Sequence, residues 1–338
     1  MNLAVVIMAA GKGTRMHSQL PKVLHPLGGQ PMVLYSLELA ARLSPEPPVL
    51  IVGHQAERVK QVVGDRARFV EQAEQLGTGH AVLQTEPLLA GNADLILVFA
   101  ADLPLLSAET LRRVVALHGQ HPGPISMLTA RVDTPRGFGR ILRGEDGSVQ
   151  AIIEEAEATP EQKAINELNA GVYCFDSWWL WPALRKLVPS PNKGEYYLTD
   201  TIAMAVADGY KVMAATTEDA EEILGINTRE HLAEAERVLR RRKNRTLMQA
   251  GVTLIDPDHT YIHPHVEVGP DTTLYPGVCL FGATEVGEGC TLGPGAVLEN
   301  VRLGPNSYVG AHVVLNDVTL PAGTRLSSAT APLPSQLG

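Results

Sequence analysis

Residues 5–16 read VVIMAAGKGTRM, and residues 20–24 continue as LPKVL. The first four residues form a short apolar run, which is typical of a buried strand in a parallel sheet. The small residues and glycines that follow allow backbone N–H groups to approach phosphate oxygens closely. Arg15 can add a planar guanidinium and Lys22 a point charge. This stretch therefore predicts a strand that leads into an anion-binding loop.

The loop matches neither of the two common phosphate-binding patterns. It is not G-x-G-x-x-G, because Arg15 and Met16 occupy the later positions, and it is not a Walker A loop. Arg15 and Lys22 could each be solvated loop charges. Their placement around a glycine turn favours contact with a ligand.

The first part of the chain, to about residue 225, alternates apolar runs with amphipathic stretches. Residues 49–52 and 95–99 read as further buried strands, and a helical stretch runs from Pro31 to about Arg42. This order predicts an α/β fold with a Rossmann-like, doubly wound sheet that binds ligands at the carboxyl ends of its strands.

A charged helix is predicted from about Arg229 to Ala250, with a basic run at residues 237–243. The run could be a patch for phosphate or RNA, or the solvated side of a linker helix. The linker is favoured because the run has no aromatic or glycine partners.

After Gly251, aliphatic residues recur at steps of six positions, with two steps of five, and mostly small residues stand two positions before them. The aliphatic positions are Ile262, Val268, Leu274, Leu280, Val286, Leu292, Leu298, Leu303, Val309, Leu315, Leu320 and Leu326. Residues two apart on a strand point the same way, so each repeat places one small and one aliphatic side chain inward. The spacing predicts a left-handed parallel β-helix of hexapeptide repeats. A β-sandwich would show longer strands and less regular spacing.

Length and composition set outer limits on these predictions. A chain of 338 residues, 45% apolar and 19% charged, is long enough for two domains, and we place the boundaries at 1–228, 229–251 and 252–330. The net charge of −9 argues against a dedicated nucleic-acid binder. No stretch reaches the roughly 20 apolar residues that span a bilayer. Three cysteines without metal-ligand spacing favour a reducing cytoplasm.

The string around Arg15 and Pro21-Lys22 resembles the signature of sugar nucleotidyltransferases. Further stretches follow in the order found in the bacterial N-acetylglucosamine-1-phosphate uridyltransferase family. They are residues 72–81, 137–141, Glu154, 167–171, 195–200 and 225–227. The resemblance covers the first domain and the opening coils of the predicted β-helix.

The resemblance implies a set of site residues. Gln72 would read the uracil edge of UTP, while Arg15, Lys22 and Asp102 would be catalytic. The expected nucleotide-binding residues are Ala9, Ala10, Gly11, Gly13, Gln72, Gly77 and Thr78. The expected sugar-phosphate residues are Gly139, Glu154, Asn169, Tyr196 and Thr199. Asp102 and Asn227 would hold Mg²⁺, an ion that takes few protein ligands.

The implied reaction is attack by the sugar-1-phosphate oxygen on the α-phosphorus of UTP, which releases pyrophosphate. The nucleophile is already ionised, so positioning and charge stabilisation carry the catalysis. Two alternatives remain: a pyrophosphorylase for another sugar-1-phosphate such as glucose-1-phosphate, and a non-catalytic regulatory subunit of the same fold. Asp102 taken alone could be a turn former, because Leu103-Pro104 follows it.

The chain also departs from the family. Ala100-Ala101 replaces Tyr-Gly, Glu155-Ala156-Glu157 replaces a run that contains lysine, and Ala170 replaces Thr. The family's usual member has a longer β-helix whose later coils acetylate glucosamine-1-phosphate, so we expect a shortened β-helix without the acetyltransferase half. The resemblance further implies a role in peptidoglycan synthesis and a homotrimer formed through the β-helix.

Overall fold

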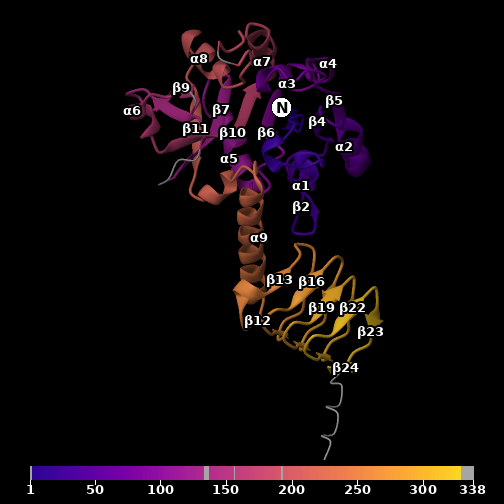
Figure 1. The fold of residues 1–338 in the computed structure, drawn as a ribbon. Helices are drawn as coiled ribbons and strands as arrows, with labels where there is room; N and C mark the ends of the chain where they lie inside the picture. The colour runs from indigo at the N-terminus through magenta and orange to yellow at the C-terminus, as the bar shows by residue number, and fades with distance from the viewer. Residues whose placement is uncertain (1, 133–136, 156, 192, 329–338) are drawn as a thin grey trace, which may run out of the picture. The chain divides into compact units, whose positions relative to one another are not determined.

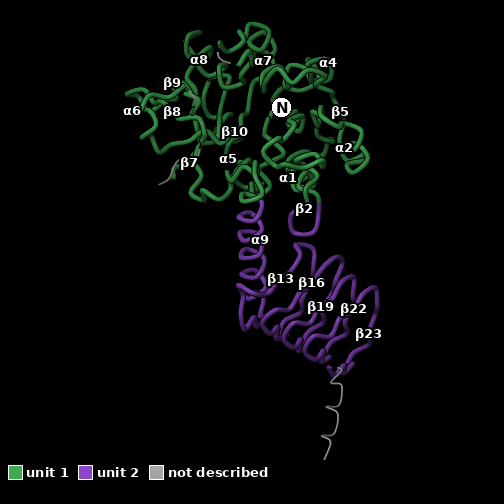
Figure 2. Tube along the Cα trace, in the orientation of Figure 1, with its two compact units in different colours: residues 1–25, 31–231 green, residues 26–30, 232–338 purple. Residues whose placement is uncertain are grey.

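The computed structural model describes residues 2–132, 137–155, 157–191 and 193–328 (Figure 1). The chain divides into two compact units (Figure 2). The first holds residues up to 25 together with 31–231, and the second holds residues 26–30 together with 232 onward. Residues 329–330, with which the predicted third region ends, lie outside the described residues.

A mixed sheet forms the centre of the first unit, in the order β11-β7-β10-β6-β1-β4-β5. Its parallel half consists of β1 (Leu3–Met8), β4 (Val49–Val52), β5 (Arg68–Glu71) and β6 (Leu95–Ala100). The three strands predicted from apolar runs are therefore confirmed. They are apolar on both faces because helices cover both sides of the sheet.

The other half of the sheet contains β7 (Ile125–Arg131), β10 (Glu167–Asp176) and β11 (Met213–Thr217). Strand β10 runs antiparallel to both β6 and β7. A hairpin of β8 (Arg140–Arg143) and β9 (Val149–Ile153) pairs with β10 through β8. The fold is thus the predicted α/β class with an antiparallel strand in the sheet.

The helices of this unit belong to two apolar clusters. Helices α1 (Val33–Ala41), α2 (Ala56–Val63) and α5 (Ala108–His118) contribute to the cluster that holds Val5 and Ile7. Helices α3 (Thr78–Leu83), α7 (Ser177–Leu184) and α8 (Asp200–Ala207) contribute to the cluster that holds Val6. Since successive β1 side chains point to opposite faces, the two clusters lie on opposite sides of the sheet.

Short elements complete this part of the chain. They are η1 (Thr14–Met16), η2 (Lys22–Leu24), η3 (Gly64–Arg66), α4 (Glu86–Leu89), α6 (Pro160–Lys163) and η4 (Ala220–Ile223). Strands β2 (Pro26–Leu27) and β3 (Gln30–Pro31) pair with each other, so α1 begins at Val33 and not at the predicted Pro31.

The second unit contains the repeats. After α9 (Arg229–Gln249) come the short element η5 (Pro257–His259) and three parallel sheets, ordered β12-β15-β18-β21-β24, β13-β16-β19-β22 and β14-β17-β20-β23. The strands are Thr253–Leu254, Tyr261–Ile262, Glu267–Val268, Thr273–Leu274, Cys279–Phe281, Glu285–Val286, Thr291–Leu292, Val297–Glu299, Arg302–Leu303, Tyr308–Val309, Val314–Asn316, Thr319–Leu320 and Arg325–Leu326, from β12 to β24.

The pairing confirms the left-handed parallel β-helix. Leu274 pairs with Leu292, and Leu280 pairs with Leu298, so three hexapeptides make one coil. Apart from the half-buried Val268, both predicted inward columns are buried as far as Val309. Leu292 represents the aliphatic column there, and Thr272 and Thr284 represent the small one.

Two residues of the basic run on α9 have partners in the β-helix, which is contrary to a fully solvated linker face. Lys243 Nζ donates to the carbonyl oxygens of Pro264 and Val266, and burial lowers the pKa of Lys243. The Arg240 guanidinium lies 4.7 Å from the centre of the Tyr261 ring. These contacts connect α9 to the opening coils. Within the described residues, none of the helices is long and apolar enough to cross a membrane.

Candidate active site

Two adjoining cavities open where β1 and β6 end. The first has a volume of about 390 Å³ and the second about 310 Å³. Met8, Thr78, Ala100, Asp102 and Tyr197 line both of them. The cavities are therefore two parts of one cleft, placed at the carboxyl ends of parallel strands as the sheet topology predicts.

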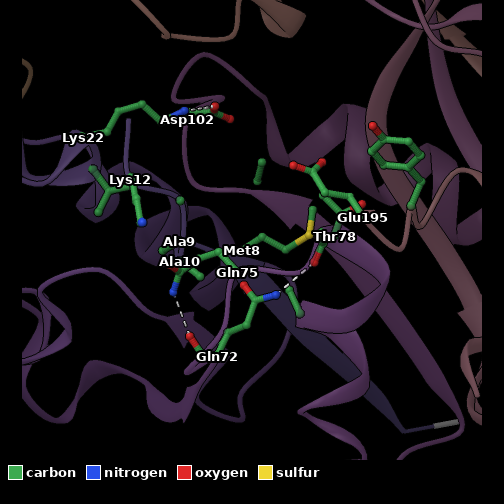
Figure 3. Close-up of a pocket in the computed structure, with 16 residues that line it drawn as sticks. Met8, Ala9, Ala10, Lys12, Lys22, Gln72, Gln75, Thr78, Asp102 and Glu195 are labelled. Atoms are coloured by element: carbon green, nitrogen blue, oxygen red, sulfur yellow. Dashed lines mark hydrogen bonds and ion pairs between the residues drawn. The ribbon is translucent and has the colours of Figure 1, made fainter. Parts of the chain in front are cut away.

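The first cavity brings together most of the residues expected to bind a nucleotide. Lys22 and Asp102 meet on one side of it, and Gln72 and Gln75 lie on another (Figure 3). The expected residues found in its wall are Ala9, Ala10, Gly11, Gln72, Gly77 and Thr78. Gln72 is buried, and its Nε2 donates to the Gly77 carbonyl at 3.0 Å, which fixes its side chain in the wall.

Gly13 is not among the lining residues, but it positions one of them. Its backbone is left-handed, with φ of +62°, and a Cβ at this position would lie 2.5 Å from Lys22 Cβ. Only glycine avoids both the strain and the collision. Gly13 therefore allows the Lys22 stem to pass close to the loop and enter the cleft.

Arg15 lies on η1 and is exposed. It is likewise absent from the residues that line the two cavities. The neighbouring Lys12 lines the first cavity instead.

The Lys22 ammonium group lies between two side-chain oxygens. Its Nζ is 2.5 Å from Asp102 Oδ2 and 3.1 Å from Asn227 Oδ1. The backbone also joins these two segments, because Ile226 N donates to the Asp102 carbonyl at 2.9 Å. Asp102 and Asn227 come from distant parts of the sequence, yet their oxygens converge on one positive charge.

This convergence fits a divalent cation. A carboxylate and an amide oxygen are donors that Mg²⁺ accepts, and the position of the Lys22 ammonium shows that positive charge is accommodated between them. In the described part of the chain, no group of three or more His, Cys, Asp or Glu residues could hold a metal ion.

The second cavity is lined both by a carboxylate, which accepts hydrogen bonds, and by amide and hydroxyl groups, which can donate them. Glu154, Asn169 and Thr199 line it together with Gly139 and Asn227. Thr199 Oγ1 donates to Glu154 Oε1 at 3.1 Å. Burial raises the pKa of Glu154, and the Thr199 hydrogen bond opposes this shift. Four of the five expected sugar-phosphate residues are thus in one wall.

The fifth, Tyr196, is not among the residues that line either cavity, whereas Tyr197 lines both. Tyr196 acts through its backbone: its N–H donates to the Leu76 carbonyl, and its carbonyl accepts from Gly79 N, each at 2.8 Å. These bonds hold residues 76–79 at the edge of the cleft. The Tyr196 ring instead packs against the apolar cluster that holds Val6, with its centre 6.4 Å from that of the His80 ring.

Several lining residues escaped the sequence reasoning. They are Lys12, Gln75, Phe138, Tyr173, Glu195 and Tyr197. All but Tyr173 belong to stretches that carried the resemblance, so their neighbourhood was signalled but their orientation was not. Tyr173 lies in a strand that reads as ordinary core.

Glu155, one of the residues that departs from the family pattern, forms an ion pair with Arg140. The buried Arg140 guanidinium lies 2.6 Å from Glu155 Oε2 and also donates to the Phe138 carbonyl. Phe138 and Glu154 both line the second cavity. Arg140 therefore connects two segments of that wall. Ala156, the middle residue of the replaced run, lies outside the described residues.

Comparisons with known proteins agree with this architecture. The family described as Nucleotidyl transferase matches residues 4–221, and the Bacterial transferase hexapeptide (six repeats) matches residues 283–317. A bifunctional protein GlmU from Pelobacter propionicus is 44% identical over 95% of this chain and 70% of its own length. Proteins of the same name from Heliobacterium modesticaldum and Syntrophotalea carbinolica are each 46% identical, over 92% and 93% of this chain and 68% of their own lengths.

Proposed function

Because the chain belongs to the nucleotidyl transferase family and is similar to bifunctional GlmU proteins, we propose that it makes UDP-N-acetylglucosamine. It is a nucleotidyltransferase, and its activity is of the UDP-N-acetylglucosamine pyrophosphorylase type. The proposed substrates are UTP and N-acetylglucosamine-1-phosphate, and pyrophosphate is the second product. The observation that carries the proposal is the single cleft in which a glycine loop, a lysine–aspartate pair and a polar second cavity meet.

In this proposal UTP occupies the first cavity, with its base near Gln72 and its phosphates over Ala10 and Gly11. Exposed Arg15, beside the same loop, contacts the outer phosphates. The sugar occupies the second cavity. Asp102 lines both cavities, which supports a meeting of the two phosphates beside it.

Catalysis then consists of orientation and charge stabilisation. The sugar-1-phosphate oxygen attacks the α-phosphorus of UTP, and pyrophosphate leaves. The Lys22 ammonium stabilises negative charge on the phosphates. GlmU-like nucleotidyltransferases use a divalent metal, and we propose that it is Mg²⁺, held by Asp102 and Asn227. When bound, this ion supplies positive charge to the phosphate oxygens.

A turnover assay with a panel of substrates tests the proposal. We expect UTP to be preferred over ATP and CTP, and N-acetylglucosamine-1-phosphate over glucose-1-phosphate, as kcat/KM ratios. Equal kcat/KM for the two sugars would favour the general UDP-sugar pyrophosphorylase. No turnover with any pair would favour the regulatory subunit.

The raised pKa of Glu154 predicts an acid limit on activity. Ionised Glu154 accepts hydrogen bonds from the sugar, and protonation removes that capacity. Because burial raises its pKa, kcat/KM for the sugar phosphate should fall at a higher pH than an ordinary carboxyl would cause. The Glu154→Gln enzyme should be slow at every pH and lack this limb. The titration of the substrate itself affects both enzymes equally. If the ratio of their kcat/KM values stayed the same across pH, the role of Glu154 would be contradicted.

We also propose that residues 1–228 carry the chemistry, that 229–251 form a linker helix, and that 252–330 assemble a homotrimer. Hexapeptide repeats support oligomerisation. One outward column of the sheet β13-β16-β19-β22 is apolar and includes Val297 and the 62% exposed Val314. The cytoplasmic location stays a prediction.

The assembly prediction concerns Val314. A charge on the apolar column should break a trimer, because it would be buried without a partner. Light scattering should give a trimer for the unaltered chain and for Thr319→Arg, which changes the outward column of another sheet, but a monomer for Val314→Arg. A monomeric unaltered chain would contradict the proposal.

A further inference from the structure

The carbonyl side of the Asn169 amide is held by two donors in the wall of the second cavity. Tyr173 is 2% exposed, and its hydroxyl donates to Asn169 Oδ1 at 2.9 Å. The backbone N–H of Gly171 donates to the same oxygen at 3.0 Å. The Nδ2 group is therefore the part of this side chain that is left to meet a ligand.

An irregularity in β10 creates this arrangement. The pairing of β10 with β7 shifts register between Asn169 and Tyr173, and Gly171 takes a φ of +68°. Such bulges re-aim side chains and are frequent beside active sites. The backbone of Asn169 is also held from the β8 side, because its N–H donates to the carbonyl of Gly139, which directly precedes β8, at 2.8 Å. The bulge thereby turns both Asn169 and Tyr173 toward the second cavity, which both residues line.

The Gly171 N–H sets the orientation of the amide, and the Tyr173 hydroxyl holds the side chain in that position. If the amide were turned over, its NH₂ group would face the Gly171 N–H, which cannot accept a hydrogen bond. Burial raises the pKa of Tyr173 and keeps its hydroxyl protonated, so in this orientation it donates the second hydrogen bond to Oδ1 and holds the side chain in place. Gly171 alone supplies one bond, and the hydroxyl supplies the second.

We propose that Tyr173 is a positioning residue that fixes the Asn169 amide as a donor toward the sugar and thereby favours sugars that present a carbonyl oxygen. This inference rests on the proposed function. A carbonyl oxygen can only accept, so it matches a fixed N–H donor. A sugar hydroxyl can donate to or accept from an amide in either orientation, so its binding depends less on a fixed orientation of the Asn169 amide. An acetamido sugar should therefore be selected over its hydroxyl counterpart partly through Tyr173, which holds Asn169 in position.

The test is the Tyr173→Phe enzyme, which retains the ring and loses the hydroxyl. KM for N-acetylglucosamine-1-phosphate should rise about tenfold, the size of one lost hydrogen bond. The preference over glucose-1-phosphate should fall by a similar factor, whereas kcat and KM for UTP should stay within about twofold. A loss of packing alone would lower the melting temperature without changing the preference between sugars. Tyr210→Phe is the matched control, because Tyr210 packs against Trp178 and is not among the lining residues of the cleft.

A second variant keeps the inference testable if Tyr173→Phe folds poorly. The carboxylate of Asn169→Asp can accept from both Gly171 and Tyr173 but offers no donor to the sugar. We expect it to lose the preference by more than Tyr173→Phe does. An unchanged sugar preference in either folded variant would overturn the inference and leave the proposed function intact. Absence of uridylyl transfer to N-acetylglucosamine-1-phosphate by the unaltered enzyme would overturn both.

Discussion

The Asp102→Asn enzyme is expected to keep its fold and to lose a factor of about 100 or more in kcat. The change preserves the shape of the side chain and removes its negative charge. That charge faces Lys22 Nζ at 2.5 Å and lies at the junction of the two cavities. The Asp102 carbonyl, which accepts from Ile226 N, is unaffected, so the backbone link between the two segments survives.

Steady-state kinetics with a Mg²⁺ titration provide the measurement. The variant should need more Mg²⁺ for half-maximal rate, because an amide is a weaker ligand than a carboxylate, and its melting temperature should match that of the unaltered enzyme. Asp65→Asn, which removes an exposed carboxylate from the same unit, should have normal kinetics. Near-normal turnover by Asp102→Asn would remove Asp102 from the site.

Regular patterns made much of the fold predictable. The six-residue spacing after Gly251 forced a parallel β-helix, because a buried small column and a buried aliphatic column have no other common solution. Apolar runs located β1, β4 and β6, because strands covered on both faces carry no polar side chains. The antiparallel placement of β10 was not predictable, since strand direction leaves no trace in a short apolar run. The grouping of residues 26–30 with the second unit depends on contacts distant in sequence.

The site was predictable as a set of stretches but not always as side chains. Gln72, Asp102, Asn169 and Asn227 were named from motifs, and the structure gathers them at one cleft. Tyr197 lines the cleft where Tyr196 had been named, because the Tyr196 ring packs against the apolar cluster that holds Val6, and the sequence does not show which of two adjacent tyrosines does so. The role inferred for Tyr173 depends on a register shift, and the glycine inside this strand, Gly171, does not by itself show where the side chains around it point.

The Lys22→Met enzyme is expected to lose about 3 kcal/mol of transition-state stabilisation, which corresponds to a factor of about 100 or more in kcat/KM. Methionine keeps an unbranched stem beside Gly13, where the Lys22 stem lies close to the glycine. It removes the ammonium group that lies between Asp102 and Asn227. The loss should appear in kcat, because negative charge on the phosphates shifts position as pyrophosphate leaves.

Lys22→Arg should restore little of this rate. A guanidinium is wider than an ammonium and presents its donors in a planar fork, whereas Lys22 contacts two separate oxygens as a compact charge. The matched control is Lys60→Met, because Lys60 pairs with Glu57 on the surface at 2.7 Å and lies outside both cavity walls. A higher KM for UTP with unchanged kcat would show that Lys22 only binds the nucleotide, and its charge would then act equally on substrate and transition state.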